Sequence, residues 1–201
     1  MYIHVIGSGS WGLALTRLLA LNGHRVRLWC RKEDRPDELR ALRHSPVFLP
    51  EVYLPDSVEV VEDVDPEVEM AVLAVPSHAM RTVVERYPLS PKTIRVSVAK
   101  GIENDSLKRM SEVIQEVSGP CTVVSLSGPS HAEEVGRDLP ASLVAASPHE
   151  EARCAVQEVF TARTFRVYTS PDQAGVELGG SVKNVIAIAA GVCDGFGLGD
   201  N

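Results

Sequence analysis

Near its amino terminus the chain reads Ile3-His4-Val5-Ile6-Gly7-Ser8-Gly9-Ser10-Trp11-Gly12, a short apolar strand followed directly by a G-x-G-x-x-G motif. Gly7 permits a tight turn, Gly9 leaves the backbone open to a pyrophosphate, and Gly12 lets the next helix pack closely on the sheet. That helix is expected to stop at Asn22-Gly23, before a second strand over residues 25–29. Because this is the context the motif requires, the pattern predicts a dinucleotide-binding βαβ unit. The alternative is a glycine turn in a βαβ unit that binds nothing.

Composition limits the class of protein. The 201 residues carry a formal net charge of −7, which argues against general nucleic-acid binding or attachment to an anionic membrane. The four cysteines lie far apart without a C-x-x-C pair, so we expect reduced thiols, no disulfide framework and no metal site. The chain starts directly with a strand, and the apolar run from Val185 to Val192 is short for a bilayer. We therefore expect a soluble, cytoplasmic protein without a signal peptide.

Strands alternate with helices along most of the chain. The continuous apolar run over residues 70–75 is typical of a strand buried on both faces. The other predicted strands cover residues 58–61, 93–99, 122–126, 141–146 and 165–169. The predicted helices cover residues 36–43, 78–87 with Ser77 as the capping residue, 106–117 and 148–160, with a short helix after Ser130. This alternation predicts an α/β fold of the Rossmann type, with a doubly wound and mostly parallel sheet, as a domain over residues 1–170.

The last segment departs from the alternation. A helix of about twenty residues is predicted over residues 172–191, and it is apolar nearly all round after Asn184. Such a helix belongs inside a bundle, so residues 171–201 are expected to be the first helix of a second, all-α substrate domain that this chain does not complete.

Four motifs now occur in order and at characteristic spacing. They are the glycine motif, Val96-Ser97-Val98-Ala99-Lys100-Gly101-Ile102-Glu103, Leu126-Ser127-Gly128-Pro129-Ser130-His131-Ala132-Glu133-Glu134 and Glu177-Leu178-Gly179-Gly180-Ser181-Val182-Lys183-Asn184. Over its whole length the chain resembles bacterial NAD(P)-dependent glycerol-3-phosphate dehydrogenase. The resemblance implies reversible hydride transfer between NAD(P)H and dihydroxyacetone phosphate, giving sn-glycerol 3-phosphate for glycerophospholipid synthesis.

The resemblance also implies that more helical bundle follows Asn201, including an arginine that grips the substrate phosphate. We therefore expect this chain alone to be inactive. One departure lies at Ser45-Pro46-Val47-Phe48-Leu49-Pro50, where the family usually has Asn and Tyr before Leu-Pro. That difference puts a contact between Phe48 and the cofactor in doubt.

The cofactor contacts expected in the glycine motif are Gly7, Gly9, Ser10, Trp11 and Gly12. In the family that the chain resembles, the two variable positions, Ser10 and Trp11, line the dinucleotide. The Ser10 hydroxyl or backbone N–H can reach the pyrophosphate, and the Trp11 indole can form a wall of the pocket. Trp11 can equally be a side chain of the core.

Cofactor choice is predicted from the end of the second strand. An acid that binds the adenosine ribose is expected there, but the positions hold Cys30, Arg31 and Lys32. A guanidinium favours a 2′-phosphate, which a carboxylate repels. The pattern therefore predicts that Arg31 and Lys32 bind the cofactor, which is NADPH or NADH with NADPH favoured. The alternative is that both are solvated surface charges.

Two of the motifs place polar groups at the carboxyl ends of strands, where open α/β sheets bind ligands. The resemblance makes Lys100 a contact of both the substrate and the cofactor. In the strand-to-helix turn at residues 128–132, the free N–H groups and the hydroxyl of Ser130 can hold an anionic substrate. We expect Gly128 and Ser130 to bind the substrate and Ala132 to contact the cofactor.

Lys183 is the predicted catalytic residue. Gly179, Gly180 and Ala187 lie about one helical turn from it, so small side chains leave a hollow beside a lysine on an apolar helix. A lysine facing this hollow can bind the substrate and exchange a proton with its oxygen as hydride is transferred, and the resemblance assigns it that role.

Further expectations concern partners. We expect a small phosphorylated triose as substrate, no nucleic acid, no membrane and a homodimer. Two alternatives to this enzyme remain: a non-catalytic dinucleotide-binding module that senses redox state, and a related dehydrogenase of small hydroxy acids or hydroxyacyl thioesters. The fold alone does not separate these alternatives.

Overall fold

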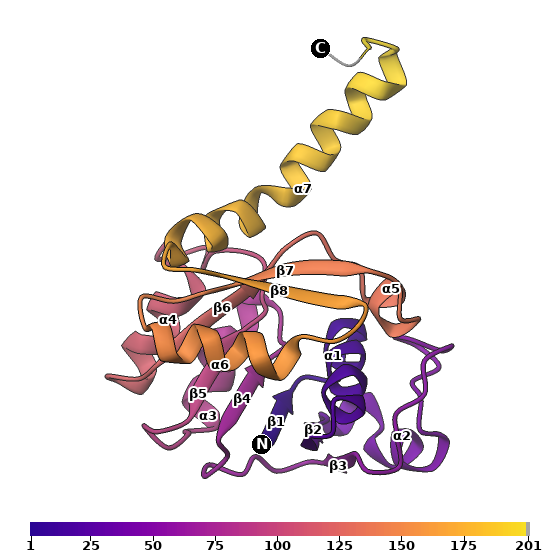
Figure 1. Cartoon of the computed structure of the whole chain (residues 1–201), viewed down its shortest axis with the longest axis vertical. Coiled ribbons are helices and arrows are strands. Elements are labelled where there is room, and N and C mark those ends of the chain that lie inside the picture. The colour runs from indigo at the N-terminus through magenta and orange to yellow at the C-terminus, as the bar shows by residue number, and fades with distance from the viewer. Residues whose placement is uncertain (200–201) are drawn as a thin grey trace.

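A computed structural model describes residues 1–199 and centres on an eight-stranded sheet (Figure 1). The strand order is β3-β2-β1-β4-β5-β6-β7-β8. Every neighbouring pair in it is parallel except β6 and β7, which run antiparallel. The strands are β1 (Tyr2–Ile6), β2 (Arg25–Trp29), β3 (Glu59–Val61), β4 (Met70–Leu73), β5 (Ile94–Ser97), β6 (Val123–Ser127), β7 (Ala141–Ala146) and β8 (Phe165–Ser170). The predicted Rossmann-type, mostly parallel sheet is confirmed.

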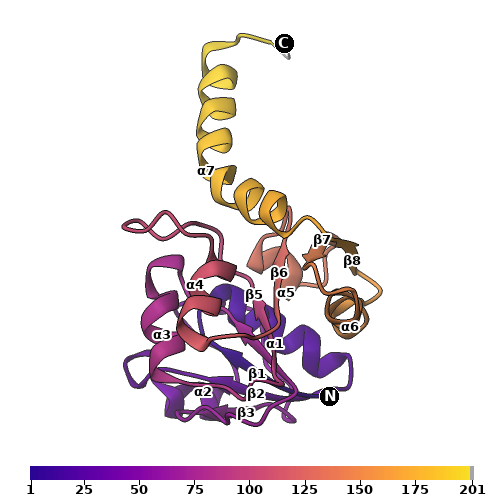
Figure 2. The same ribbon diagram turned by 90° about the vertical axis from the view of Figure 1, so that its left-hand side faces the viewer.

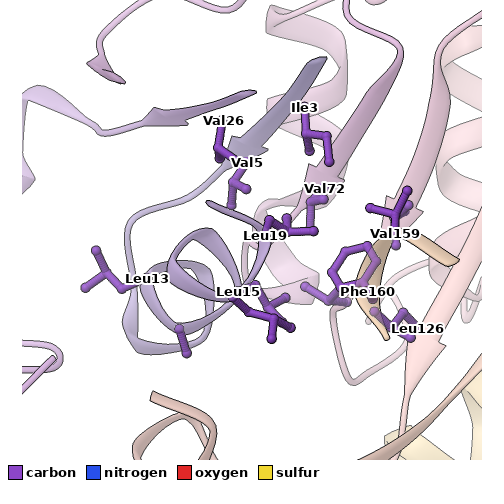
Figure 3. Close-up of a cluster of buried hydrophobic side chains, with 14 of the residues drawn as sticks. Ile3, Val5, Leu13, Leu15, Leu19, Val26, Val72, Leu126, Val159 and Phe160 are labelled. Atoms are coloured by element: carbon purple, nitrogen blue, oxygen red, sulfur yellow. The ribbon is translucent and has the colours of Figure 1, made fainter. Parts of the chain in front are cut away.

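Helices cover both faces of this sheet (Figures 1 and 2). They are α1 (Ser10–Leu21), α2 (Pro36–Leu42), α3 (Met80–Arg86), α4 (Met110–Ser118), α5 (Ala132–Gly136), α6 (Glu150–Phe160) and α7 (Gln173–Phe196), with 3-10 turns η1 (Lys32–Asp34) and η2 (Ser77–Ala79). Figure 3 shows the core on one face, where Leu15 and Leu19 of α1 approach Val72 of β4 and Phe160 of α6. A second cluster, under α3 and α4, covers the opposite face. Double coverage explains why every residue of β4 is buried.

The observed helix starts differ from the sequence-based predictions most clearly in two places. The helix expected from residue 106 begins at Met110, because residues 101–109 form a loop in which Leu107 has a left-handed φ of 57°. A bidentate ion pair between Arg81 and Glu103, with nitrogen–oxygen distances of 2.9 and 2.8 Å, holds this loop. The helix expected from residue 78 begins as the 3-10 turn η2, so Ser77 lies inside the first turn instead of at a capping position.

Helix α7 ends at Phe196, five residues beyond its predicted end at residue 191. Its carboxyl-terminal half projects away from the sheet (Figures 1 and 2). Gly197, in the left-handed conformation, ends it. Of its residues, all within the described part of the chain, Glu177 is the buried one, whereas large apolar side chains such as Ile188 and Phe196 are exposed. By length and composition this helix could cross a membrane. Because a core helix of a helical domain has the same properties, this finding is weak evidence for either.

Candidate functional site

The glycine loop joins β1 to α1 in a conformation that only small residues permit. Gly7 has a φ of 121°, and a β-carbon built on it would lie 2.4 Å from the carbonyl oxygen of Ala74. A β-carbon on Gly12 would lie 1.9 Å from the carbonyl oxygen of Gly7. Apart from its chain neighbours, by contrast, no atom of residues 1–199 lies within 4 Å of a β-carbon built on Gly9. The loop is therefore packed at Gly7 and Gly12 and open at Gly9, where the first amides of α1 can receive an anion.

Ser10 and Trp11 follow as the first residues of α1. The Ser10 hydroxyl donates a hydrogen bond of 2.5 Å to the carbonyl oxygen of Phe48, which ties the 45–49 loop to the glycine loop. The Trp11 side chain is half-buried and packs against the core cluster of Figure 3. Dinucleotide contacts by these two residues stay predictions.

A cavity of about 640 Å³ lies beside the end of β2. The residues after β2 form one wall, with Arg31 and Lys32, and η2 with α3 forms the other, with His78 and Arg86. The sheet order places β1 between β2 and β4, the point at which the strand order reverses and where open α/β sheets bind nucleotides. Arg31 and Lys32 thus line a cavity beside this point, and their contact with a dinucleotide stays a prediction.

Asp34, which no sequence motif marks, lies between Arg31 and the glycine loop. Its carboxylate accepts hydrogen bonds from Arg31 and, at 3.3 Å, from the hydroxyl of Ser8 in the glycine loop. Asp34 lies in the 3-10 turn η1, and its backbone carbonyl oxygen accepts a hydrogen bond of 3.7 Å from Sγ of Cys30, the residue after β2. A sequence signal exists in the three-residue spacing of Arg31 and Asp34, but the contact with Ser8 depends on the fold.

A second pocket, of about 390 Å³, lies where the carboxyl ends of β5 and β6 meet α7. It contains both predicted lysines, and its lining includes Lys100, Ser127, Gly128, Gly179 and Lys183. The Lys100 ammonium donates a hydrogen bond of 3.1 Å to the carbonyl oxygen of Gly128. Burial, and secondarily the positive charge of Lys183, lowers the pKa of Lys100. Two lysines that share a partly apolar pocket suit an anionic ligand.

The Gly179-Gly180 pair allows α7 to approach the sheet closely. A β-carbon on Gly180 would lie 2.7 Å from Oγ of Ser127 and 3.8 Å from Cγ of Lys100, whereas one on Gly179 would meet open space. The helix therefore rests on the end of β6 at Gly180, and Lys183 follows about one turn later on the wall of the same pocket.

Glu177 fixes the same helix from another side. Its carboxylate accepts hydrogen bonds from the Ser111 amide at 2.8 Å, the Ser111 hydroxyl at 2.7 Å and Nη1 of Arg109 at 3.0 Å. Ser111 lies in the first turn of α4, and Arg109 pairs with Ile102 across the loop that follows Lys100. Glu177 therefore connects the helix that carries Lys183 to the loop that follows Lys100. It lies within a quoted motif, but its partners are distant in sequence.

The remaining predicted residues lie next to these pockets. Ser130 is buried, and its hydroxyl donates a hydrogen bond of 3.3 Å to the carbonyl oxygen of Gly128, which Lys100 also contacts. Ala132 starts α5 and packs against the core beneath α1. The structure thus brings Lys100, Gly128 and Lys183 together in one pocket, with Ser130 behind it and Ala132 in the packing layer.

These features define a class: a Rossmann-type dinucleotide-binding protein with a lysine-containing ligand pocket at the carboxyl edge of its sheet. Comparison with known proteins makes the assignment specific. The chain belongs to the NAD-dependent glycerol-3-phosphate dehydrogenase family, since residues 2–153 match the N-terminal model of that family and residues 172–201 match its C-terminal model.

Individual proteins that the chain resembles are glycerol-3-phosphate dehydrogenases. The chain is 47% identical to the glycerol-3-phosphate dehydrogenase (NAD(P)+) of Pelotomaculum thermopropionicum over 99% of this chain and 59% of that protein. It is 50% identical to the corresponding protein of Chlorobium luteolum over 100% of this chain and 63% of that protein. The crystal structure of glycerol-3-phosphate dehydrogenase from Coxiella burnetii superimposes with a TM-score of 0.90 at 36% identity, covering all of this chain and 63% of that one. The chain thus spans about three fifths of the length of the relatives it matches.

Proposed function

We propose that the protein containing this chain is an NAD(P)-dependent glycerol-3-phosphate dehydrogenase. It would reduce dihydroxyacetone phosphate to sn-glycerol 3-phosphate for glycerophospholipid synthesis, and catalyse the reverse oxidation. The observation that carries the proposal is that the open glycine loop and the two-lysine pocket lie at the same edge of one sheet. Family membership supports the substrate class.

The glycine loop fits a dinucleotide because Gly9 is open while Gly7 and Gly12 are packed. The amides at the start of α1 would hold the pyrophosphate, and Arg31 and Lys32 the adenosine half, with NADPH favoured over NADH. When bound, the nicotinamide supplies or accepts the hydride.

The lysines would supply the charge and the proton. The Lys183 ammonium would bind the substrate and give a proton to its carbonyl oxygen during reduction, then recover the proton from solvent. Lys100, held by the Gly128 carbonyl, would attract the anionic substrate and stabilise negative charge that develops on that oxygen. Apolar side chains such as Val144 and Ile186, which line the pocket, would limit access of water.

We propose further that the protein is cytoplasmic and forms a homodimer, and that its partner is the small phosphorylated substrate and not a nucleic acid or a membrane. The negative net charge supports the last point.

The proposal is tested first on dinucleotide binding. Gly9→Ala creates no contact within the fold, so the melting temperature should stay unchanged while the affinity for NADPH and NADH falls at least tenfold. Gly195→Ala is the matched control, since position 195 also has open space but lies toward the far end of α7. Unchanged affinity in Gly9→Ala would refute the proposed cofactor site.

Turnover is tested in the full-length protein, with dihydroxyacetone phosphate and each reduced cofactor. Oxidation of the cofactor only with this substrate supports the proposal. Binding without turnover would indicate a redox-sensing module. Turnover of a hydroxy acid or hydroxyacyl thioester in its place would indicate the related dehydrogenases.

A further inference from the structure

Arg31, the predicted ligand of a 2′-phosphate, already has an anionic partner. Its Nε donates to Oδ2 of Asp34 and its Nη2 donates to Oδ1, both at 2.8 Å. This bidentate geometry is the one in which a guanidinium binds carboxylate or phosphate most strongly. The edge of Arg31 best suited to a phosphate is therefore occupied by a group of the chain itself.

The burial of this pair is unequal. The Arg31 side chain is 58% exposed, whereas that of Asp34 is 12% exposed. Asp34 also accepts the hydrogen bond from Ser8, a buried residue between the first two glycines of the loop. The carboxylate is thus fixed between the glycine loop and the arginine, which distinguishes it from an ordinary surface ion pair between residues three apart.

The position of Asp34 bears on recognition of the adenosine ribose. In dinucleotide folds the acid that binds the ribose hydroxyls lies at the end of the second strand, which here holds the buried Cys30. Four residues further along, the backbone carbonyl oxygen of Asp34 in η1 accepts a hydrogen bond of 3.7 Å from Sγ of Cys30, which places Asp34 beside the end of β2. A carboxylate therefore lies close to Cys30 and the glycine loop, although the position directly after β2 is not an acid.

We propose that Asp34 is the residue that sets the choice between the two dinucleotides. Within a site in which Arg31 and Lys32 favour NADPH, Asp34 reduces that preference in two ways: its charge repels the 2′-phosphate, and it occupies the bidentate edge of Arg31. A 2′-phosphate must then bind the remaining N–H donors of Arg31 beside a carboxylate, or displace Asp34. This inference rests on the proposed dinucleotide site.

Asp34→Asn tests the proposal because it removes the charge and keeps the shape. The affinity for NADPH relative to NADH should rise about tenfold, the size expected for one neighbouring charge in a partly screened site. The readout is the fluorescence of each reduced dinucleotide on titration with protein, alongside a thermal melt. Asp34→Ser, which removes the same charge with a smaller side chain, provides a second variant if the amide disturbs the turn.

Two further variants complete the test. Asp37→Asn is the control, since Asp37 lies on the neighbouring helix α2 with its side chain 96% exposed and should leave the ratio unchanged. Arg31→Ala should shift the ratio toward NADH, because the remaining partner for the 2′-phosphate is lost. A ratio within twofold of the parent in both Asp34 variants, or a shift toward NADH, would overturn the inference. Failure of the unmodified protein to bind either dinucleotide would instead refute the proposed function.

Discussion

Removal of the Glu177 carboxylate should release α7 from the sheet domain. Three donors, the amide and hydroxyl of Ser111 and the guanidinium of Arg109, converge on this carboxylate, which is 6% exposed. In Glu177→Ala these donors lose their acceptor, and the first turn of α4 loses the anion at its amino terminus.

The size of the effect follows from these contacts. Breaking a buried ion pair by removing one partner costs ~3–5 kcal/mol. Arg109 keeps a second ion pair, with Glu112 at 2.9 Å, so the lower end of that range, about 3 kcal/mol, is expected. The loss should appear as local opening between α7 and α4 more than as global unfolding. Since 1.4 kcal/mol corresponds to a factor of ten, opening should become about 100-fold more frequent.

Hydrogen exchange at the Ser111 amide reports the loss of this contact, because that amide donates to Glu177. Exchange should accelerate about 100-fold in Glu177→Ala and less in Glu177→Gln, which keeps an acceptor oxygen. The control is Glu151→Ala, a change at an exposed position in the first turn of α6. If Ser111 exchanges within threefold of the parent rate in Glu177→Ala, the carboxylate does not hold α7.

Three other variants address catalysis, packing and pH. In the full-length protein, Lys183→Ala should lower turnover in a steady-state assay on the order of 100-fold or more, with little change in dinucleotide affinity. Turnover within a few-fold of the parent would contradict a role of Lys183 as proton donor. Gly180→Val should lower the free energy of unfolding, measured in urea, by ~1–3 kcal/mol because its β-carbon would meet Oγ of Ser127 at 2.7 Å. Gly179→Ala meets open space and should be neutral or stabilising. Equal urea midpoints for the two variants would refute this packing. Burial and a nearby guanidinium lower the pKa of His4 to about 4. As the pH falls, His4 is therefore protonated in the unfolded state before it is protonated in the folded state. The free energy of unfolding should fall by about 3 kcal/mol between pH 6.5 and 4. Urea titrations at pH 7, 5 and 4 should show this dependence in the parent and not in His4→Asn.

Much of the sheet could be predicted because its signals are local. The glycine motif and the apolar run of β4 define their elements through residues that are adjacent in sequence. The antiparallel direction of β7 could not be predicted, since the side-chain period of a strand is the same in both directions. The start of α4 was misplaced because residues 101–109 are held by Arg81, which is distant in sequence.

The residues of the candidate site likewise divide into those predicted from local sequence and those whose partners are distant in sequence. Lys100 and Lys183 were found from motifs, and both line the second pocket. Asp34 and Glu177 were missed as functional candidates because their significance depends on partners that the fold supplies, Ser8 in one case and Ser111 in the other. A residue type in a motif indicates chemistry. An acid that positions another group can be recognised only when the structure shows which donors its carboxylate binds.

The two missed acids indicate how the sheet domain and the last helix cooperate. Each carboxylate is largely buried, and each holds an arginine that borders a pocket or the loop beside it. Asp34 keeps Arg31 next to the glycine loop, and Glu177 joins α7 to the loop that follows Lys100. The position of Lys183 relative to Lys100 therefore depends on a contact outside the pocket itself. Since each carboxylate loses these bonds if its donor moves, a shift of α7 or of η1 should alter ligand binding before it disturbs the sheet.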